Sequence, residues 1–139
     1  TGNNHALDRR SIGVRLTIDA LEEQGMAYTG TRRDASGTFH AVTETKGWSI
    51  AWISCAYGTN GLPDPEDLVL DCFDTGRVTE LIQALKDQHD AVIVTPHWGA
   101  EYQLSPQTAM INFARAWIDQ GATAVIGAHP HVPQPWEAY

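Results

Sequence analysis

The second half of the chain alternates between two hydrophobic patterns. Apolar residues recur at helical spacing in 74–90, DTGRVTELIQALKDQHD, and in 105–121, SPQTAMINFARAWIDQG. A short apolar run follows each segment, AVIVTP at 91–96 and TAVIG at 123–127, and is typical of a strand buried on both faces. Alternating helices and strands predict α/β units whose neighbouring strands are parallel and joined by right-handed crossovers.

Three residues mark the ends of the second of these helices. Ser105 can cap its start, Pro106 suits its first turn, and Gly121 can end it. We therefore expect this helix to begin directly after Ser105.

The first half of the chain is less regular. The segment 10–25, RSIGVRLTIDALEEQG, has helical spacing and stops at a glycine, whereas MAYTG at 26–30 is typical of a short strand. The segment 39–55 predicts two strands around a turn near 45–47. The stretch 57–68, YGTNGLPDPEDL, is rich in Gly, Pro, Asn and Asp and predicts a loop.

Length and charge narrow the class of protein. With 139 residues, 42% of them hydrophobic, the chain can form one domain over 1–139 with a real core. The net charge of −8 argues against nucleic-acid binding, which requires clustered basic residues; Arg9-Arg10 and Arg32-Arg33 are the only basic doublets. The sequence starts at Thr1 inside a motif-like segment, without Met or a visible signal peptide, and we interpret it as a piece of a longer protein.

The two cysteines, Cys55 and Cys72, form no Cys-x-x-Cys metal or redox pattern. They neither require nor exclude an oxidising compartment. We expect the two thiols to stay apart, and a disulfide is the alternative that the sequence leaves open.

Histidines follow both predicted C-terminal strands. His97 comes directly after the first, and His129 and His131 come after the second. Because ligands collect at the carboxyl ends of parallel strands, we expect these three imidazoles to share one rim of the sheet. Residues two apart point the same way in an extended segment, and Pro130 biases His129 towards such a segment, so both rings can face one cation. Neutral imidazole suits zinc, iron, nickel and copper and, with oxygen ligands, manganese.

An ordinary surface or hydrogen-bonded role is the alternative for each of these histidines. We expect that role for His40, on a strand surface, and for His89, at a helix C-terminus, where the helix dipole favours a positive ring.

Four ordered motifs carry a resemblance to a known family. NNHALD, YGTNG, HWGAEY and GAHPHVPQPWE resemble, in order and approximate separation, segments of the CapA-type (PgsA-type) poly-γ-glutamate capsule-synthesis family, which looks like a branch of the calcineurin-like metallophosphoesterases. The resemblance covers nearly the whole chain. It implies an α/β fold, a partial αββα sandwich with parallel strands in the C-terminal half, and a two-metal site at the strand ends.

The resemblance implies a set of metal ligands. It makes Asn4 a ligand through its side-chain oxygen, sharing one metal with His97 and His129, while His131 serves the other metal. One departure is Ala128, which separates the glycine of the family's paired-histidine motif from His129. The aspartates of the superfamily's N-terminal motifs have no counterpart in this sequence, so we expect at most part of the two-metal site here.

The resemblance also implies a catalytic histidine. It makes His5 a non-ligand that donates a proton to a leaving oxygen or stabilises the charge on it. The acidic residue that usually follows directly is Ala6 here, and Asp8 is the nearest carboxylate that can orient His5.

Three more residues are candidates for substrate binding. Glu101 and Tyr102 follow His97 closely and can point into the same cleft, or form a solvated loop edge. Asn60 can shape a substrate-facing loop, or serve as a turn residue tolerant of unusual backbone angles.

Two functions are compatible with these implications. The first is a hydrolase, in which two divalent cations (Mn, Zn or Fe) in the full-length protein act on a phosphoester or on an amide of a poly-γ-glutamate-like chain. The second is a non-catalytic accessory protein that binds the polymer alongside membrane-bound synthase subunits. For both, the resemblance implies the extracellular face of the cell envelope, with an anchor before residue 1. We expect residues 1–139 alone to be inactive.

Overall fold

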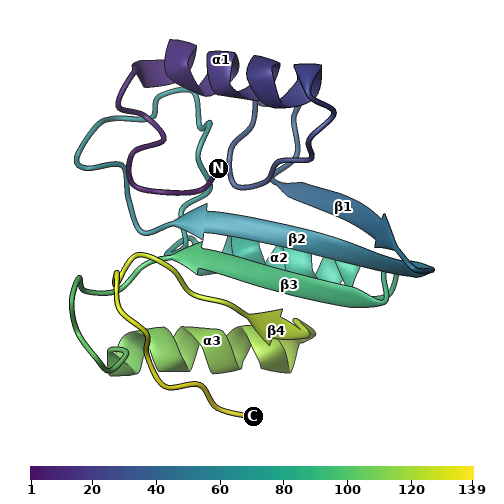
Figure 1. Cartoon of the computed structure of the whole chain (residues 1–139), viewed down its shortest axis with the longest axis vertical. Helices are drawn as coiled ribbons and strands as arrows, with labels where there is room; N and C mark the ends of the chain where they lie inside the picture. The colour runs from purple at the N-terminus through teal and green to yellow at the C-terminus, as the bar shows by residue number, and fades with distance from the viewer.

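Four strands form one mixed sheet at the centre of the molecule. A computed structural model describes residues 1–139, apart from the side chain of Thr75. The strands β1 (His40–Thr45), β2 (Trp48–Ala56), β3 (Ala91–His97) and β4 (Ala124–Val125) lie in the order β1-β2-β3-β4 (Figure 1). β1 and β2 are antiparallel, whereas β2, β3 and β4 are parallel. The predicted α/β class with parallel strands in the C-terminal half is therefore confirmed.

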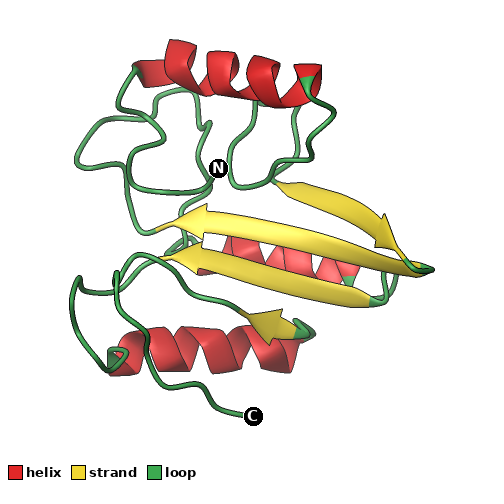
Figure 2. Cartoon of the chain, viewed as in Figure 1, coloured by secondary structure: helices red, strands yellow, loops and turns green.

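Two helices cover one face of this sheet. α2 (Thr75–Leu85) connects β2 to β3, and α3 (Thr108–Gln120) connects β3 to β4, so both lie in crossover connections between parallel strands (Figure 2). The Asp74 side chain caps α2 by accepting a hydrogen bond of 3.2 Å from the backbone N–H of Arg77.

α3 begins two residues later than predicted. Its N-cap is Gln107, with an extended backbone and no side-chain cap hydrogen bond, so the expected roles of Ser105 and Pro106 are wrong. The first backbone hydrogen bonds at this end go from Met110 and Ile111 to the Gln107 carbonyl oxygen. Gly121 ends the helix as predicted, with φ of 119°, a left-handed value that glycine adopts without steric cost.

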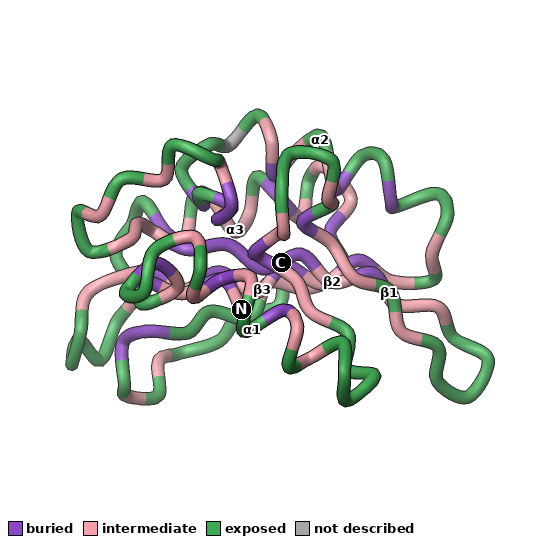
Figure 3. The backbone as a smooth tube through the Cα atoms, turned by 90° about the horizontal axis from the view of Figure 1, so that it is seen from above, coloured by how far each residue is buried: buried purple, intermediate pink, exposed green. Residues whose placement is uncertain are grey.

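Burial alternates along β3 and does not extend over both faces as predicted. Val92, Val94 and Pro96 are buried, whereas Ile93 and Thr95 are half-buried. Val92 and Val94 pack with residues of α2 and α3. Figure 3 shows the buried positions running along the middle of the molecule. This main core contains Phe39, Ala51, Ile53, Cys55, Leu70, Cys72, Val78, Ile82, Leu85, Val92, Val94, Trp98, Met110, Trp117 and Ala122.

α1 (Arg10–Glu23) belongs to a second, smaller core. Its buried residues Val14 and Ile18 pack with Leu7, Ala56, Leu68 and Val69, so the helix rests on the loop between β2 and α2. This packing holds the N-terminal segment beside the carboxyl end of β2 (Figure 1).

The hairpin in 39–55 is confirmed, whereas the short strand at 26–30 is wrong. Lys46 and Gly47 both have positive φ, 50° and 83°, as a tight two-residue hairpin turn requires. Gly30 adopts φ of 88°, and a Cβ there would lie 2.6 Å from the backbone nitrogen of Gly2. The chain therefore turns at Gly30 to admit the N-terminal segment, and only an isolated bridge joins Thr31 to Val69.

Cys55 and Cys72 form a disulfide, so the expectation that they stay apart is wrong. Ala56 exchanges backbone hydrogen bonds of 2.9 Å with Leu70 and Cys72, which brings the segment before α2 alongside the end of β2. The cross-link spans 17 residues and is fully buried. The sequence could not predict this pairing because the path of the intervening loop decides it.

Candidate functional site

The carboxyl end of β3 brings His97 against the segment that follows β4. His97 is the last residue of β3, and an isolated parallel bridge pairs it with Ala128. The Trp98 N–H donates to the Ala128 carbonyl oxygen at 3.0 Å, and the Ala128 N–H donates to that of Pro96 at 2.9 Å. The rings of His97 and His129 consequently lie 4.8 Å apart, centre to centre.

His129 and His131 approach each other by a different backbone route from the one predicted. Their ring centres are 5.7 Å apart, but φ is 99° at His129 and 59° at His131, so the segment is not extended. Left-handed backbone costs a non-glycine residue roughly 1–3 kcal/mol and persists only where the surroundings hold it. Here the Pro130 carbonyl oxygen between the two histidines accepts a hydrogen bond of 2.7 Å from the Tyr102 N–H.

Asn4 reaches the same place from the N-terminal segment. The residue is 8% exposed, and its Oδ1 lies 3.0 Å from Nε2 of His97. Its Nδ2 donates to Oδ1 of Asn60 at 3.0 Å. Asn4 therefore does not cap α1, whose N-cap is Arg9. Asn60, with φ of 53°, contacts Asn4 in addition to forming the expected turn.

His5 and Asp8 form a pair at the exposed edge of this group. Nδ1 of His5 lies 2.8 Å from Oδ2 of Asp8, and both side chains are at least half exposed. Nδ2 of Asn60 lies 3.4 Å from the same His5 nitrogen. Because Asp8 engages Nδ1, Nε2 of the imidazole is available to another partner.

Two further residues from the loop after β3 border the histidines. Oε1 of Glu101 is 3.9 Å from Nε2 of His131, and the Tyr102 ring stacks on that of His131 at 5.8 Å. The ring of Tyr57, which was not predicted, lies 4.8 Å from that of His129, centre to centre and tilted by 40°, and the Tyr57 N–H donates to the His97 carbonyl oxygen at 2.9 Å. Its position directly after a strand that ends at this rim was the available sequence signal.

Burial and neighbouring imidazoles lower the pKa of His97 and so favour its neutral form. Burial lowers its pKa most, and the neighbouring His129, His131 and His5 lower it further. Neutral imidazole is the form that binds metals. Three imidazoles, an amide oxygen and a carboxylate make a donor set that suits divalent zinc, iron or manganese.

The remaining two histidines lie away from this rim. His40, on β1, contacts the Thr38 hydroxyl through Nδ1. His89 lies four residues beyond the end of α2, and its Nδ1 is 2.8 Å from the Ser49 hydroxyl. Both have local partners and share no contact with the rim residues described above.

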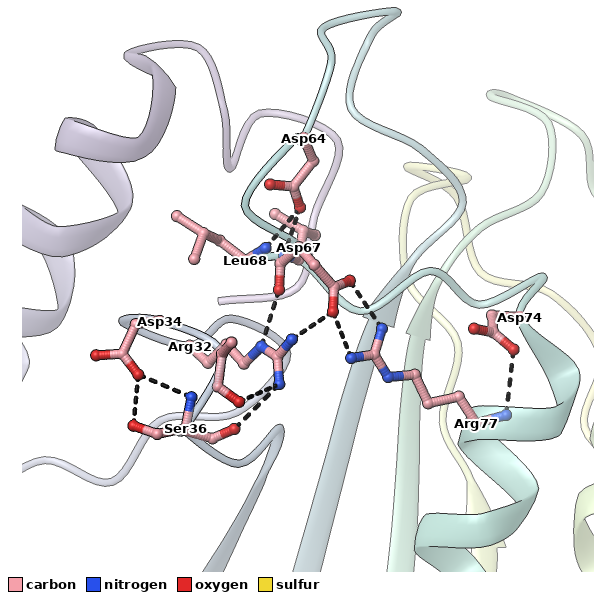
Figure 4. Close-up of polar contacts among 11 residues, drawn as sticks. Arg32, Asp34, Ser36, Asp64, Asp67, Leu68, Asp74 and Arg77 are labelled. Atoms are coloured by element: carbon pink, nitrogen blue, oxygen red, sulfur yellow. Dashed lines mark hydrogen bonds and ion pairs between the residues drawn. The ribbon is translucent and has the colours of Figure 1, made fainter.

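One of the two arginine doublets is neutralised within the fold. Arg32 and Arg77 both pair with the Asp67 carboxylate (Figure 4). Their guanidinium groups also lie over the Phe39 ring, at 4.5 Å and 4.7 Å from its centre. The hydrogen bond from Arg77 is the largest influence holding the pKa of Asp67 below its usual range. Arg33 pairs with two carboxylates of α1, those of Asp19 and Glu22.

Within the part of the chain that the structure describes, no helix combines the length and apolar character needed to cross a membrane.

Comparison with known proteins identifies the family. The chain is 28% identical over 145 residues to the capsule biosynthesis protein CapA of Bacillus anthracis, covering 99% of this chain and 35% of that protein. It is 30% identical over 153 residues to the PGA biosynthesis protein CapA of Bacillus subtilis (strain 168), covering 100% and 38%. A probable polyglutamine synthesis accessory protein of Mycobacterium tuberculosis (strain H37Rv) is 28% identical over 153 residues, covering 99% and 40%. The chain thus spans less than half of these relatives' lengths. Residues 1–139 match the family of the bacterial capsule synthesis protein PGA_cap, and the chain belongs to that family.

Proposed function

We propose that this chain contributes to the synthesis of a poly-γ-glutamate capsule and that its strand-end cluster binds divalent cations. The strand-end cluster comprises Asn4, His97, His129 and His131. Family membership and the names of the two Bacillus relatives support the capsule role.

One observation carries the metal-binding part of the proposal. Three segments that are distant in sequence converge. Oδ1 of Asn4 lies 3.0 Å from Nε2 of His97, although the two residues are 93 positions apart in the chain. His129, which is 9% exposed, lies against His97 and links it to His131. Convergence of one amide oxygen and three imidazoles favours cation binding over a set of unrelated surface histidines.

The finer proposal is a metal-dependent hydrolase. Bound divalent cations supply Lewis acidity and a source of hydroxide at neutral pH. Asp8 orients His5 through Nδ1, so that Nε2 can pass a proton to a leaving oxygen or nitrogen. The exposed Tyr102 ring borders the cluster, where it can contact substrate. The substrate is an amide of poly-γ-glutamate or a phosphoester.

A second candidate is a polymer-binding accessory at the extracellular face of the cell envelope, anchored there and acting with membrane-bound synthase subunits. The charge distribution limits how such an accessory could hold the polymer, because a chain of net charge −8 repels a polyanion and Arg32 and Arg33 are already paired. Retention of polymer would then depend on cations in the cluster or on the exposed Arg9 and Arg10.

Single alanine substitutions at the four cluster residues test the metal-binding part in the full-length protein. We expect each variant to lose bound Mn²⁺ or Zn²⁺, measured by elemental analysis, while His89→Ala keeps it. Unchanged metal content in all four variants would refute the proposal.

Turnover separates the two candidates. Hydrolysis of poly-γ-glutamate or of a generic phosphodiester that disappears with His5→Ala supports the hydrolase. Co-purification with synthase subunits, with polymer binding that chelation abolishes and no turnover, supports the accessory role.

A further inference from the structure

We propose that Glu101 is a metal ligand that supplies a carboxylate oxygen to the cation held by His131. This inference rests on the proposed function and adds a ligand to the strand-end cluster. It also gives Glu101 a different role from the substrate contact that its sequence position suggested.

The geometry gathers three donor groups on the His131 side of the cluster. Glu101, His129 and His131 each offer a donor atom, and these atoms all lie within 4.8 Å of one another. The closest pair is Oε1 of Glu101 and Nε2 of His131, at 3.9 Å. This separation is longer than a hydrogen bond and lies within about 4.0–4.4 Å, the distance that two ligands of one cation can span at about 2.0–2.2 Å each.

Hydrogen bonds join the loop that carries Glu101 to the loop that carries His131. Gly99 has φ of 95°, which lets the chain turn sharply after Trp98, and Tyr102 has φ of 59°. The hydrogen bond from the Tyr102 N–H to the Pro130 carbonyl oxygen then ties the residue after Glu101 to the residue before His131. Further along, Nε2 of Gln134 donates to the Gln103 carbonyl oxygen at 2.9 Å. Two left-handed turns, at Gly99 and Tyr102, and two hydrogen bonds thus hold the Glu101 loop beside the His131 loop.

The cluster divides into two halves around His129. Asn4 and His97 meet on one side, at 3.0 Å, and Glu101 and His131 meet on the other. The His129 ring lies between them, 4.8 Å from that of His97 and 5.7 Å from that of His131. Each half therefore pairs one oxygen donor with one imidazole.

A carboxylate on the second half has a chemical consequence. It adds the negative charge that a neutral imidazole cannot supply, and it favours cations that accept oxygen ligands, such as Mn²⁺, over softer ones. The Glu101 and His131 side chains are 51% and 54% exposed, so this half is open to solvent. An open half leaves room for a substrate oxygen beside the cation.

The test is metal titration of the full-length protein with Mn²⁺ alone, followed by calorimetry and by manganese electron paramagnetic resonance. We expect Glu101→Gln to weaken one class of Mn²⁺ site by at least about tenfold, on the scale of the loss from disturbing a metal-site group. His131→Ala should remove the same class of Mn²⁺ site, whereas Asn4→Ala should weaken the other class of site, on the His97 side. Glu44→Gln, an exposed carboxylate on β1, removes the same charge elsewhere and is the matched control.

The possible outcomes separate this inference from the proposed function. If Glu101→Gln binds Mn²⁺ like Glu44→Gln while His131→Ala loses a site, Glu101 is not a ligand and the cluster remains a metal site. If neither His131→Ala nor Asn4→Ala changes binding, the proposed function fails together with the inference. A changed Mn²⁺ spectrum in Glu101→Gln, with the Asn4 half intact, supports direct ligation.

Discussion

Asn60 holds the side-chain amide of Asn4 in one orientation, although 56 residues separate them. The Asn60 Oδ1 accepts a hydrogen bond of 3.0 Å from Nδ2 of Asn4, which directs Oδ1 of Asn4 towards Nε2 of His97. With the opposite orientation, Asn4 would present an NH₂ group, which cannot bind a cation. The loop between β2 and α2 therefore controls whether Asn4 offers an oxygen.

Removal of the Asn60 side chain should weaken metal binding without disturbing the loop backbone. Asn60→Gly suits this test because glycine accepts φ of 53° without strain. We expect Mn²⁺ affinity to fall roughly 10- to 100-fold, the usual cost of losing a group that orients a ligand. Asn60→Asp, which keeps an acceptor for Nδ2 of Asn4, should retain more of the affinity than Asn60→Gly.

Calorimetry measures these affinities, and Lys46→Gly is the control for a glycine introduced at positive φ far from the cluster. Equal Mn²⁺ affinity in Asn60→Gly and Lys46→Gly would show that Asn60 does not orient Asn4.

The strained histidine turn predicts an unusual ranking of stability. His131 has φ of 59°, where a side chain costs roughly 1–2 kcal/mol and glycine costs almost nothing. The free energy of unfolding of His131→Gly, measured in urea, should therefore exceed that of His131→Ala by about 1 kcal/mol, although both variants lose the imidazole. At His89, which lacks positive φ, the alanine variant should be at least as stable as the glycine variant. If the glycine and alanine variants rank in the same order of stability at His131 and at His89, the backbone at His131 is not strained.

The buried disulfide should contribute a large share of the stability. Closing a loop of this length restricts the unfolded chain and typically contributes about 3 kcal/mol. We expect Cys55→Ala/Cys72→Ala to lower the free energy of unfolding in urea by about 2–4 kcal/mol. Wild-type protein in reducing buffer should behave like this variant once the disulfide is broken. Identical urea midpoints for oxidised and reduced wild type would refute the contribution.

The ion pair between Asp67 and Arg77 predicts a loss of stability at low pH. The folded-state pKa of Asp67 lies below the ordinary value of 3.8, chiefly because Arg77 donates a hydrogen bond to the carboxylate. The pair's contribution is therefore complete above that ordinary value and is lost as the pH falls through the lower folded-state pKa. Asp67→Asn, which tolerates the left-handed backbone there, should be less stable than wild type at neutral pH.

Urea titrations of both proteins at several pH values measure this difference. The gap between wild type and Asp67→Asn should narrow as the pH falls below about 4, where the carboxyl begins to protonate. A gap that stays constant down to the acid transition would show that the Arg77 contact does not lower the pKa.

The sequence by itself determined the elements whose burial repeats with a regular period. α1, α2, the β1–β2 hairpin and the parallel pair β3–β4 follow from spacing, because each side chain's environment is set by the helix or strand that carries it. It also placed His97 and the His129–His131 pair at strand ends that neighbour each other, because parallel strands end at the same edge.

Only the tertiary structure decided what happens between those elements. The left-handed turn at His129 and His131 is held by the hydrogen bond from Tyr102 to Pro130. The disulfide of Cys55 with Cys72 and the contacts of Asn60 and Tyr57 likewise join segments distant in sequence. Loop backbones carry no hydrophobic period, so their paths depend on which neighbours supply hydrogen bonds and space. A local pattern could place the histidines at the rim, but the packing of the two loops determines where their rings and the Glu101 carboxylate meet.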